Sequence, residues 1–440
     1  MYKPSEYNII TEASGGYVLY NAISKSLNYV SSDEMSNIKK CFGGEKDHQY
    51  IPVLVNKGYL VGQDSSERLM ADMVFFKQIF DSRLELTIMP TEDCNFRCKY
   101  CYETFEHGKM SPEMVQNVID YVRKNMRNYT SMSVSWFGGE PLEAADVIDT
   151  LSQAFIRFCM ERKIPYAAGI TTNGYNLDQN VLEMLLKNRV NTIQFTLDGL
   201  AETHDKYKVL KDGSPTHEVV LHNLRNIRDN CKKRLLDVVI RTNVSKEMLG
   251  RLDEIIAFYD SEFGQDPRFS FFFRPVGDWG GEAVKDINDS VFGEGEYNPV
   301  YETLLKNNTN LNYKMYHNEL VHDINICYAN RMNSYVFGSD GMVYKCTNKF
   351  DYDVNKIGTL GDKGILSINE DKATKWTLQG CNTSAECNRC KLLPACHAAS
   401  CTAAQLNGDK SEPTCPHMKH NITTLMKLVS KNRKLVPTLF

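Results

Sequence analysis

Three cysteines lie close together in the first quarter of this 440-residue chain. Cys94, Cys98 and Cys101 have the spacing C-x3-C-x2-C, and Tyr100 stands directly before the last of them. Cysteine thiolates bind the irons of iron–sulfur clusters, and three thiolates leave one iron of a [4Fe–4S] cluster without a protein ligand. Such an iron can bind a small molecule and pass an electron to it. The spacing therefore predicts a redox-active cluster with an open coordination position.

Zinc binding and disulfide bonds are the two other uses of clustered cysteines. Structural zinc sites take four ligands, usually in paired C-x2-C units, and this loop has three cysteines at a different spacing. Disulfides require an oxidising compartment. The N-terminal sequence MYKPSEYNII lacks the basic and then apolar order of a signal peptide. We therefore expect a cytoplasmic protein with free thiols.

The composition limits the possible partners. A net charge of −4 and a pI of about 6.2 give no broad basic surface for nucleic acid. The sequence has no apolar run long enough to span a membrane. We therefore expect neither nucleic acid nor a membrane as partner.

A second group of cysteines lies in the C-terminal part of the chain. Its members are Cys327, Cys346, Cys381, Cys387, Cys390, Cys396, Cys401 and Cys415. Cys41, Cys159 and Cys231 are isolated and are interpreted as ordinary thiols. So many cysteines in a cytoplasmic chain indicate metal or cluster binding rather than a disulfide framework.

Strand-like and helical segments alternate between residues 84 and 275. The predicted strands are 84–90, 131–137, 166–172, 191–197, 236–244 and 268–275. Amphipathic helical segments such as 111–126 and 251–263 lie between them. This order predicts an α/β fold with a parallel sheet, curved into a partial (β/α)6 TIM-like barrel. The three-cysteine loop follows the first strand, and barrel enzymes hold their active sites at that end of the strands.

The regions around this barrel differ from it in pattern. Residues 1–80 combine strand-like segments at 7–11, 17–21 and 26–30 with helical segments from 31 and over 51–61. They predict a winged-helix-like domain, or alternatively an extension packed on the main body. The barrel is expected over residues 81–280 and an irregular bridging region over 281–326. The cysteine-rich domain is expected over 327–440, with a helix over 416–440.

With these motifs the chain resembles radical S-adenosylmethionine (SAM) enzymes of the SPASM subfamily over roughly residues 84–415. It is similar to the thioether-forming peptide maturases of the ranthipeptide and sactipeptide kind. The resemblance implies that the open iron chelates the amino and carboxylate groups of SAM. One electron then releases a 5′-deoxyadenosyl radical, which takes a hydrogen atom from the substrate. The cofactors carry this chemistry, so no catalytic residue beyond the cluster is assigned.

The resemblance also implies a set of SAM contacts. Glycines allow a close backbone approach, carboxylates pair with ammonium groups, and arginine suits a carboxylate. The expected residues are Gly138, Gly139 and Glu140 for the methionine part, Asn173 for the ribose, Arg241 for the carboxylate and Tyr100 near adenine. Taken alone, the GGEP and TNG segments are more often turns, Arg241 could be salt-bridged, and Tyr100 could be a core aromatic residue.

The C-terminal cysteines resemble the seven-cysteine SPASM pattern, which implies two auxiliary [4Fe–4S] clusters and three clusters in all. By this resemblance, the outer cluster is held by Cys387, Cys390, Cys396 and Cys415, and the inner cluster by Cys327, Cys346 and Cys401. The family has three residues between the cysteines that correspond to Cys396 and Cys401, where this chain has four. A structural zinc site is the alternative. Residues 328–345 contain no cysteine, so the inner cluster is expected to have an open iron unless Cys381 or another group fills it.

The family resemblance also bears on the reaction. In anaerobic sulfatase-maturating relatives an Asp follows the cysteine that corresponds to Cys346 and acts as a base, whereas this chain has Thr347. The N-terminal domain fits a leader-recognition element that pairs a peptide strand with its sheet. We therefore expect a maturase that forms sulfur-to-carbon thioethers in a ribosomally made precursor peptide. An external one-electron donor such as flavodoxin or ferredoxin is expected.

Two alternatives to thioether formation stay open. The first is a carbon–carbon, cyclophane-type crosslinking maturase. The second is a non-enzymatic winged-helix regulator that senses redox state through iron–sulfur clusters.

Overall fold

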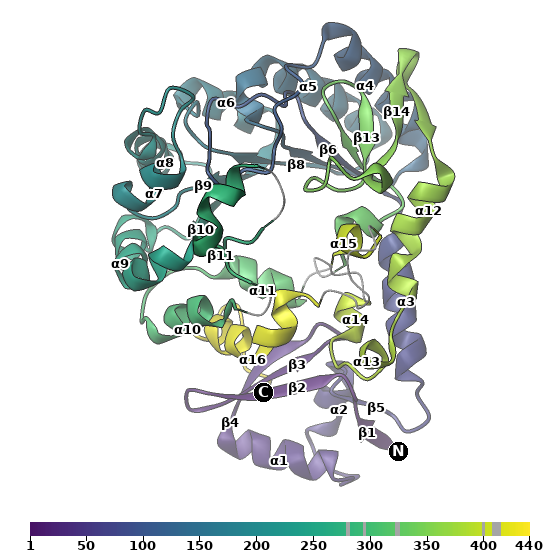
Figure 1. The fold of residues 1–440 in the computed structure, drawn as a ribbon. Coiled ribbons are helices and arrows are strands. Elements are labelled where there is room, and N and C mark those ends of the chain that lie inside the picture. The colour runs from purple at the N-terminus through teal and green to yellow at the C-terminus, as the bar shows by residue number, and fades with distance from the viewer. Residues whose placement is uncertain (279–281, 294–295, 322–325, 398–400, 407–414) are drawn as a thin grey trace.

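The computed structural model describes the chain except for residues 279–281, 294–295, 322–325, 398–400 and 407–414 (Figure 1). In the described part, one long sheet has the strand order β11-β10-β9-β8-β7-β6-β12-β13-β14-β15. Its first six strands pair in parallel. They are β6 (Arg83–Ile88), β7 (Ser131–Trp136), β8 (Tyr166–Thr172), β9 (Val190–Thr196), β10 (Asp237–Val244) and β11 (Phe269–Pro275). The predicted partial barrel is confirmed.

Helices cover the outer face of these strands (Figure 1). They are α4 (Pro112–Asn125), α5 (Ala145–Arg162), α6 (Gln179–Lys187), α7 (Ala201–Tyr207), α8 (His217–Asn230) and α9 (Leu252–Phe263). The start of α4 shows how local sequence determines where one of these helices begins. The Ser111 hydroxyl accepts a hydrogen bond from the Met114 N–H at 3.1 Å, and Pro112 occupies the first helical turn.

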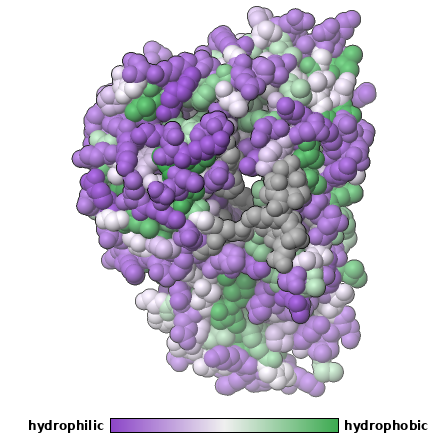
Figure 2. All heavy atoms as spheres, in the orientation of Figure 1, coloured by the Kyte–Doolittle hydropathy of each residue, from purple (hydrophilic) through white to green (hydrophobic). Residues whose placement is uncertain are grey.

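β6 and β7 alternate between buried apolar residues and more accessible polar ones. On β6, Leu84, Leu86 and Ile88 are buried, whereas Glu85 and Thr87 lie on the other face. A strand buried on both faces of a parallel sheet would be apolar throughout. The inner face of this barrel therefore borders a polar, partly accessible space. Figure 2 shows that this side of the molecule is largely hydrophilic and is hollowed near its centre.

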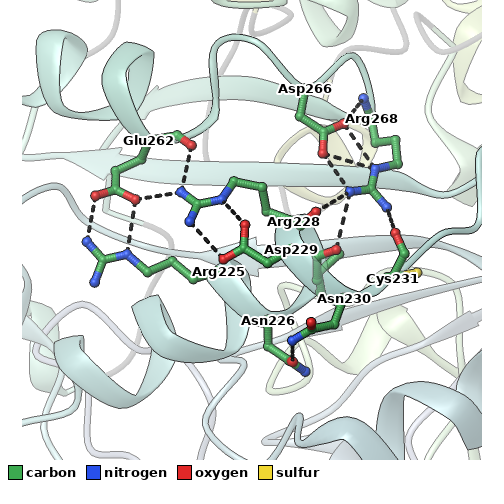
Figure 3. Close-up of polar contacts among 10 residues, drawn as sticks. Arg225, Asn226, Arg228, Asp229, Asn230, Cys231, Glu262, Asp266 and Arg268 are labelled. Atoms are coloured by element: carbon green, nitrogen blue, oxygen red, sulfur yellow. Dashed lines mark hydrogen bonds and ion pairs between the residues drawn. The ribbon is translucent and has the colours of Figure 1, made fainter.

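Charged side chains join α8 to α9 on the outside of the barrel (Figure 3). The Glu262 carboxylate binds the Arg225 guanidinium at 2.5 Å and that of Arg228 at 2.9 Å. Asp266 binds Arg268 at 2.6 Å, and Arg268 also donates to the Arg228 carbonyl at 3.0 Å. This network fixes the loop that leads into β11.

The cysteine-rich region continues the barrel sheet. β12 (Ser334–Phe337) pairs in parallel with β6, and β13 (Met342–Tyr344), β14 (Lys356–Gly361) and β15 (Ile365–Ile368) follow in antiparallel order. The short helices beyond them are α12 (Glu370–Leu378), α13 (Ala385–Asn388), α14 (Leu393–Cys396) and α15 (Thr402–Leu406), and α16 (His417–Ser430) follows. The predicted helix over 416–440 is therefore too long, because α16 ends at Ser430.

The N-terminal domain pairs β2 (Asn8–Ala13), β3 (Gly16–Asn21) and β4 (Leu27–Ser31) in an antiparallel sheet. α1 (Ser32–Phe42) follows, and Ser31 and Glu34 form its capping box. β1 (Tyr2–Pro4) pairs with β5 (Leu60–Gly62). α3 (Glu67–Ile79) leads into the barrel.

Two further secondary-structure predictions were wrong. The helix expected over 51–61 is α2 (Ile51–Asn56) followed by β5, since Gly58 has a φ of +77° and β1 pairs with the residues beyond it. The bridging region, expected to be irregular, contains α10 (Asn298–Lys306) and α11 (Lys314–Val321). Packing against β11 and α16 stabilises these short helices. No described helix has the length and apolar character needed to cross a membrane.

Candidate active site

The three-cysteine loop leaves the C-terminal end of β6 and is fixed by a second loop. The Arg97 N–H donates to the Val209 carbonyl at 2.8 Å, and the Lys99 N–H donates to the Tyr207 carbonyl at 2.9 Å. The Lys211 N–H in turn donates to the Asn95 carbonyl at 3.0 Å. These bonds fasten the loop that carries Cys94, Cys98 and Cys101 to the segment 207–211.

The three thiols of this loop lie in mutual electrostatic range. Burial raises the pKa of all three thiols, to about 12 for Cys101. Negative charge on Cys98 raises the pKa of Cys94 and Cys101 further. The Lys208 ammonium lies 3.6 Å from the Cys98 sulfur and opposes this effect. Burial therefore disfavours the thiolate form of these cysteines, and binding to iron would supply the positive charge that thiolates need.

The donor set fits an iron–sulfur cluster. In the part of the chain that the structure describes, no three Cys, His, Asp or Glu side chains converge on a single metal-ion position. A [4Fe–4S] cluster needs a different arrangement, because each thiolate binds its own iron. Cys94 and Cys101 lie in electrostatic range of Cys98 on one short loop, and each of the three thiolates could bind one iron of such a cluster.

The glycine turn after β7 lies directly against the cysteine loop. A Cβ atom on Gly138 would lie 2.3 Å from the Thr91 carbonyl oxygen, and one on Gly139 would lie 2.3 Å from that of Asp93. Gly138 also has a φ of +117°. Only glycine fits at these two positions, so the turn and the cysteine loop form one continuous surface.

Glu140 connects the ends of β7 and β8. Its buried carboxylate accepts hydrogen bonds from the Thr172 hydroxyl at 2.7 Å, the Asn173 N–H at 2.7 Å and the Leu142 N–H at 3.0 Å. Burial raises the pKa of Glu140 to about 7. The sequence predicted Glu140 as a SAM contact but gave no sign of this second role, which is to position the turn that carries Asn173.

Asn173 lies beside the cysteine loop. Its side-chain N–H2 donates to the Asn95 side-chain oxygen at 2.7 Å and lies 3.9 Å from the Cys94 sulfur. The structure thus brings Asn173 and Glu140 to the same edge as the three cysteines, as the carboxyl ends of neighbouring parallel strands require.

Tyr100 belongs to a hydrogen-bonded group of three side chains. Its hydroxyl donates to the Asp198 carboxylate and accepts from the Asn243 side chain at 3.2 Å. The Asn243 N–H also donates to Asp198 at 2.9 Å. Sequence reasoning singled out Tyr100 but missed Asn243, which lies two residues after Arg241 and thus on the same face of β10.

Arg241 lies on the inner face of the barrel, where its Nε donates to the Asn243 side chain at 3.1 Å. Burial and the positive charge of Arg274, on the neighbouring strand β11, lower the pKa of Arg241. A carboxylate beside these two arginines would be electrostatically stabilised. The position therefore suits the anionic group that the sequence assigned to Arg241.

The cysteines assigned to the inner cluster gather beside the end of β13. Burial raises the pKa of Cys327 to about 12 and that of Cys346 to about 11. Charge on Cys346 and Cys401 raises the pKa of Cys327, and charge on Cys401 raises that of Cys346. These three thiols therefore lie in mutual range, although residues 398–400, just before Cys401, are outside the described part of the chain.

Cys387, Cys390 and Cys415, assigned to the outer cluster, lie around Lys419. The Lys419 ammonium donates to the Cys415 sulfur at 3.1 Å, and charge on Cys415, Cys390 and Cys387 raises the pKa of Lys419. Cys396, the fourth assigned ligand, ends α14. Cys381 is exposed. Its pKa is raised first by the burial that remains and then by the negative charge of Asp72, rather than by that of another cysteine.

Sequence reasoning missed Tyr102 and Glu103, which directly follow Cys101, and Tyr102 lies in electrostatic range of the inner cysteine Cys346. Burial raises the pKa of Tyr102, and charge on Glu103, Cys101 and Cys346 raises it further. Burial also raises the pKa of Glu103 to about 8, and its buried Oε1 has no hydrogen-bond partner among the described residues. A buried, unpaired carboxyl oxygen indicates a place where a ligand donor belongs.

Comparisons with known proteins show which proteins the chain is similar to. Residues 88–256 match the family model of the Radical SAM superfamily and are a radical SAM domain. The cysteine-type anaerobic sulfatase-maturating enzyme of Clostridium novyi is 24% identical over 346 residues, which are 72% of this chain and 87% of that protein. Fe-coproporphyrin III synthase of Methanosarcina barkeri is 24% identical over 270 residues, or 60% of this chain and 61% of that protein.

A solved structure shows the same fold. The structure of native anSMEcpe with bound AdoMet superimposes with a TM-score of 0.60 at 16% sequence identity. The match covers 79% of this chain and 99% of that one.

Proposed function

We propose that the protein is a radical SAM maturase that modifies a ribosomally made peptide. The observation that carries the proposal is that Tyr102, the residue directly after Cys101, lies in electrostatic range of Cys346, which is in turn in range of Cys327 and Cys401. The Clostridium novyi relative is a sulfatase-maturating enzyme, and anSMEcpe has been solved with AdoMet and a peptide bound. Both support a polypeptide substrate.

We infer further that the modification is a sulfur-to-carbon thioether. The residue after Cys346 is Thr347, whose N–H donates to the Tyr328 hydroxyl at 2.9 Å. No carboxylate base stands at this position. The charge that acts on Cys381 is that of Asp72, whereas the charges of Cys346 and Cys401 act on Cys327. An inner cluster with three protein thiolates would leave one iron for a substrate thiolate.

The residues of the chain would then divide the work. Cys94, Cys98 and Cys101 would hold the radical SAM cluster, and the two auxiliary clusters would be held by the C-terminal cysteines. When bound, these clusters and SAM supply a 5′-deoxyadenosyl radical, a site that keeps a thiol deprotonated, and an acceptor for the electron released on carbon–sulfur bond formation. Glu140 and Asn173 would position the methionine and ribose parts of SAM, and Arg241 its carboxylate.

The test begins with 5′-deoxyadenosine release by the anaerobically reconstituted and reduced protein. Short peptides encoded beside the gene are then added and analysed by mass spectrometry after thiol alkylation. Each thioether should remove two hydrogens and make one cysteine resistant to alkylation. Hydrogen loss with every cysteine still alkylated would reject the thioether and favour the carbon–carbon crosslink. A protein that releases no 5′-deoxyadenosine would reject the enzyme as a whole.

A further inference from the structure

The turn after β13 directs hydrogen-bond donors at the sulfur of Cys346, which is one of the three cysteines assigned to the inner cluster. The Asn348 N–H donates to the Cys346 sulfur at 3.4 Å. Burial raises the pKa of Cys346 to about 11, whereas hydrogen bonds from the Asn348 and Lys349 N–H groups lower it. Two backbone donors are therefore aimed at this predicted ligand.

The hydroxyl of Tyr328 is a third donor to the same sulfur. Its hydrogen bond also lowers the pKa of Cys346, against the larger effect of burial. The Tyr328 oxygen accepts the Thr347 N–H at 2.9 Å and lies 2.9 Å from the Thr347 hydroxyl. A tyrosine hydroxyl has one hydrogen to donate and an oxygen that accepts. When Thr347 donates through both its N–H and its hydroxyl, the hydrogen of the Tyr328 hydroxyl is left for the sulfur.

Tyr328 and Thr347 also join the segments that carry two of the inner-cluster cysteines. Tyr328 directly follows Cys327 in the chain, and Thr347 directly follows Cys346. The hydrogen bonds between them therefore connect these two predicted ligands. Thr347 stands where sulfatase-maturating relatives have an Asp, and in this chain it orients a hydrogen-bond donor.

A buried asparagine holds the Cys346 turn in shape. The Asn355 side-chain oxygen accepts the Cys346 N–H at 2.8 Å and the Lys345 N–H at 3.0 Å. Its side-chain N–H2 donates to the Cys346 carbonyl at 2.9 Å and to the Lys349 carbonyl at 2.8 Å. Asn355 is fully buried, and these four bonds use both of its side-chain polar atoms. The turn that presents the donors is therefore tied to a satisfied side chain.

We propose that Tyr328 raises the reduction potential of the inner cluster by donating a hydrogen bond to the Cys346 sulfur, and that Thr347 holds the Tyr328 hydroxyl in this orientation. Hydrogen bonds to the sulfurs are among the factors that set the potential of an iron–sulfur cluster. A donor beside a ligand sulfur stabilises the reduced cluster, because that form carries one more negative charge.

This inference deepens the proposed function and rests on it. When a bound substrate thiolate bonds to a carbon radical, one electron is released, and the inner cluster is its acceptor. The hydrogen taken from that carbon leaves in 5′-deoxyadenosine, and the thiol proton is lost when the thiolate binds. A higher potential makes the cluster a better electron acceptor, so Tyr328 would favour the crosslinked product.

The test is a redox titration of the full reconstituted chain, followed by electron paramagnetic resonance. The inner-cluster signal is identified as the one that disappears in Cys401→Ala. Tyr328→Phe removes the hydroxyl and keeps the ring. We expect the equilibrium constant for one-electron reduction of the inner cluster to fall about tenfold, which lowers its midpoint potential by about 59 mV. The iron content should stay the same.

Tyr335→Phe, on β12, is the matched control. Burial raises the pKa of Tyr335 to about 12, and its charged neighbours are Tyr129 and Glu370 rather than a cysteine. This variant loses a buried tyrosine hydroxyl as well, but it should leave the inner-cluster potential unchanged.

Two further measurements separate the hydrogen bond from packing. In D2O, the deuteron of the Tyr328 hydroxyl should couple to the inner-cluster spin in pulsed electron–nuclear double resonance, and this coupling should be lost in Tyr328→Phe. Thr347→Val removes the hydroxyl that orients Tyr328 and should lower the potential in the same direction. Thr347→Ser keeps a hydroxyl and should restore the potential.

Several results would overturn the proposal. They are an unchanged inner-cluster potential in Tyr328→Phe, an equal shift in Tyr335→Phe, and a deuteron coupling that persists without the Tyr328 hydroxyl. Should Tyr328→Phe lose iron, the two Thr347 variants decide. Equal potentials in Thr347→Val and Thr347→Ser would then overturn the proposal.

Assays of peptide modification keep this inference apart from the proposed function. An unchanged potential in Tyr328→Phe, in an enzyme that forms thioethers, would reject the role of Tyr328 alone. A lowered potential in an enzyme that modifies no peptide would reject the proposed function and the acceptor role, and would leave the hydrogen bond to Cys346 in place. An unaltered chain without a signal that depends on Cys401 would overturn this inference and the inner cluster on which thioether formation depends.

Discussion

The ammonium group of Lys208 lies 3.6 Å from the sulfur of Cys98, and Lys208 is almost fully buried. The rings of Phe96 and Tyr100 flank the ammonium group at 5.5 and 5.8 Å. Burial alone would lower the pKa of Lys208, but the charges of Cys98 and Asp198 raise it. A fixed positive charge therefore lies beside a predicted cluster ligand, where it would stabilise the more negative, reduced cluster.

Replacing Lys208 by Met should make the radical SAM cluster harder to reduce. We expect the midpoint potential to fall by a few tens of millivolts, since one buried charge is removed close to a ligand sulfur. Redox titration followed by electron paramagnetic resonance measures this. Lys208→Arg keeps the charge and should shift the potential less, and the exposed Lys206→Met is the matched control. A potential unchanged in Lys208→Met would contradict the electrostatic role.

The triple variant Cys94→Ala, Cys98→Ala, Cys101→Ala should lose one of three clusters. Iron content should fall from about twelve to about eight atoms per chain, and SAM cleavage should disappear. Cys231→Ala, at an isolated and partly buried thiol, should keep both the iron and the activity. Residual cleavage in the triple variant would disprove the assignment of this loop.

Cys381 and Cys401 should behave differently, because Cys401 lies in range of Cys327 and Cys346 whereas Asp72 is the charged neighbour of Cys381. Cys401→Ala should lose about four irons, and Cys381→Ala should lose none. Iron and sulfide analysis of the two variants decides this. Iron loss in Cys381→Ala would make Cys381 the fourth ligand of a closed cluster.

Glu140→Gln should weaken SAM binding about tenfold through the position of Asn173. The Glu140 carboxylate accepts three hydrogen bonds, and an amide in its place offers a donor where an acceptor is needed. Equilibrium dialysis with SAM measures the affinity. Glu143→Gln, in the same turn but without a buried carboxylate, is the control, and equal affinities in the two variants would count against the role of Glu140.

The ion-pair network between α8 and α9 predicts that the folded protein loses stability in acid. Arg225 and Arg228 lower the pKa of Glu262, and Arg268 lowers that of Asp266 although burial opposes this. Because these folded-state pKa values lie below the unfolded ones, the stabilisation is present above pH ~4.5 and is lost as the pH falls through the lowered values. Glu262→Gln should cost about 1 kcal/mol at pH 7, because the partner arginines are partly exposed, and it should flatten the loss of melting temperature between pH ~5 and ~3. A Glu262→Gln variant whose melting temperature falls with pH as steeply as that of the unaltered protein would contradict this prediction.

Local patterns were enough to predict the barrel. Strand-like segments such as 84–90 and 166–172 alternate with amphipathic helical segments such as 111–126, and each of these signals lies within a short stretch of sequence. The bridging helices α10 and α11 were missed because such short segments gain their stability from packing partners rather than from their own pattern. The same holds for β5, which the distant β1 specifies.

By itself, the sequence determined which residues could do the chemistry: the cysteine spacing from Cys94 to Cys101, the glycine turn at Gly138, and the cysteines of the C-terminal region. Thiolate chemistry and backbone freedom belong to residue types, so they can be inferred without coordinates. Only the tertiary structure decided that Lys208 meets Cys98, that Asn243 joins Tyr100 to Asp198, and that Leu439 completes the sheet at Tyr29. These contacts join residues far apart in the chain, and they exist only because the barrel and its neighbouring domains bury apolar faces together, which no local pattern encodes.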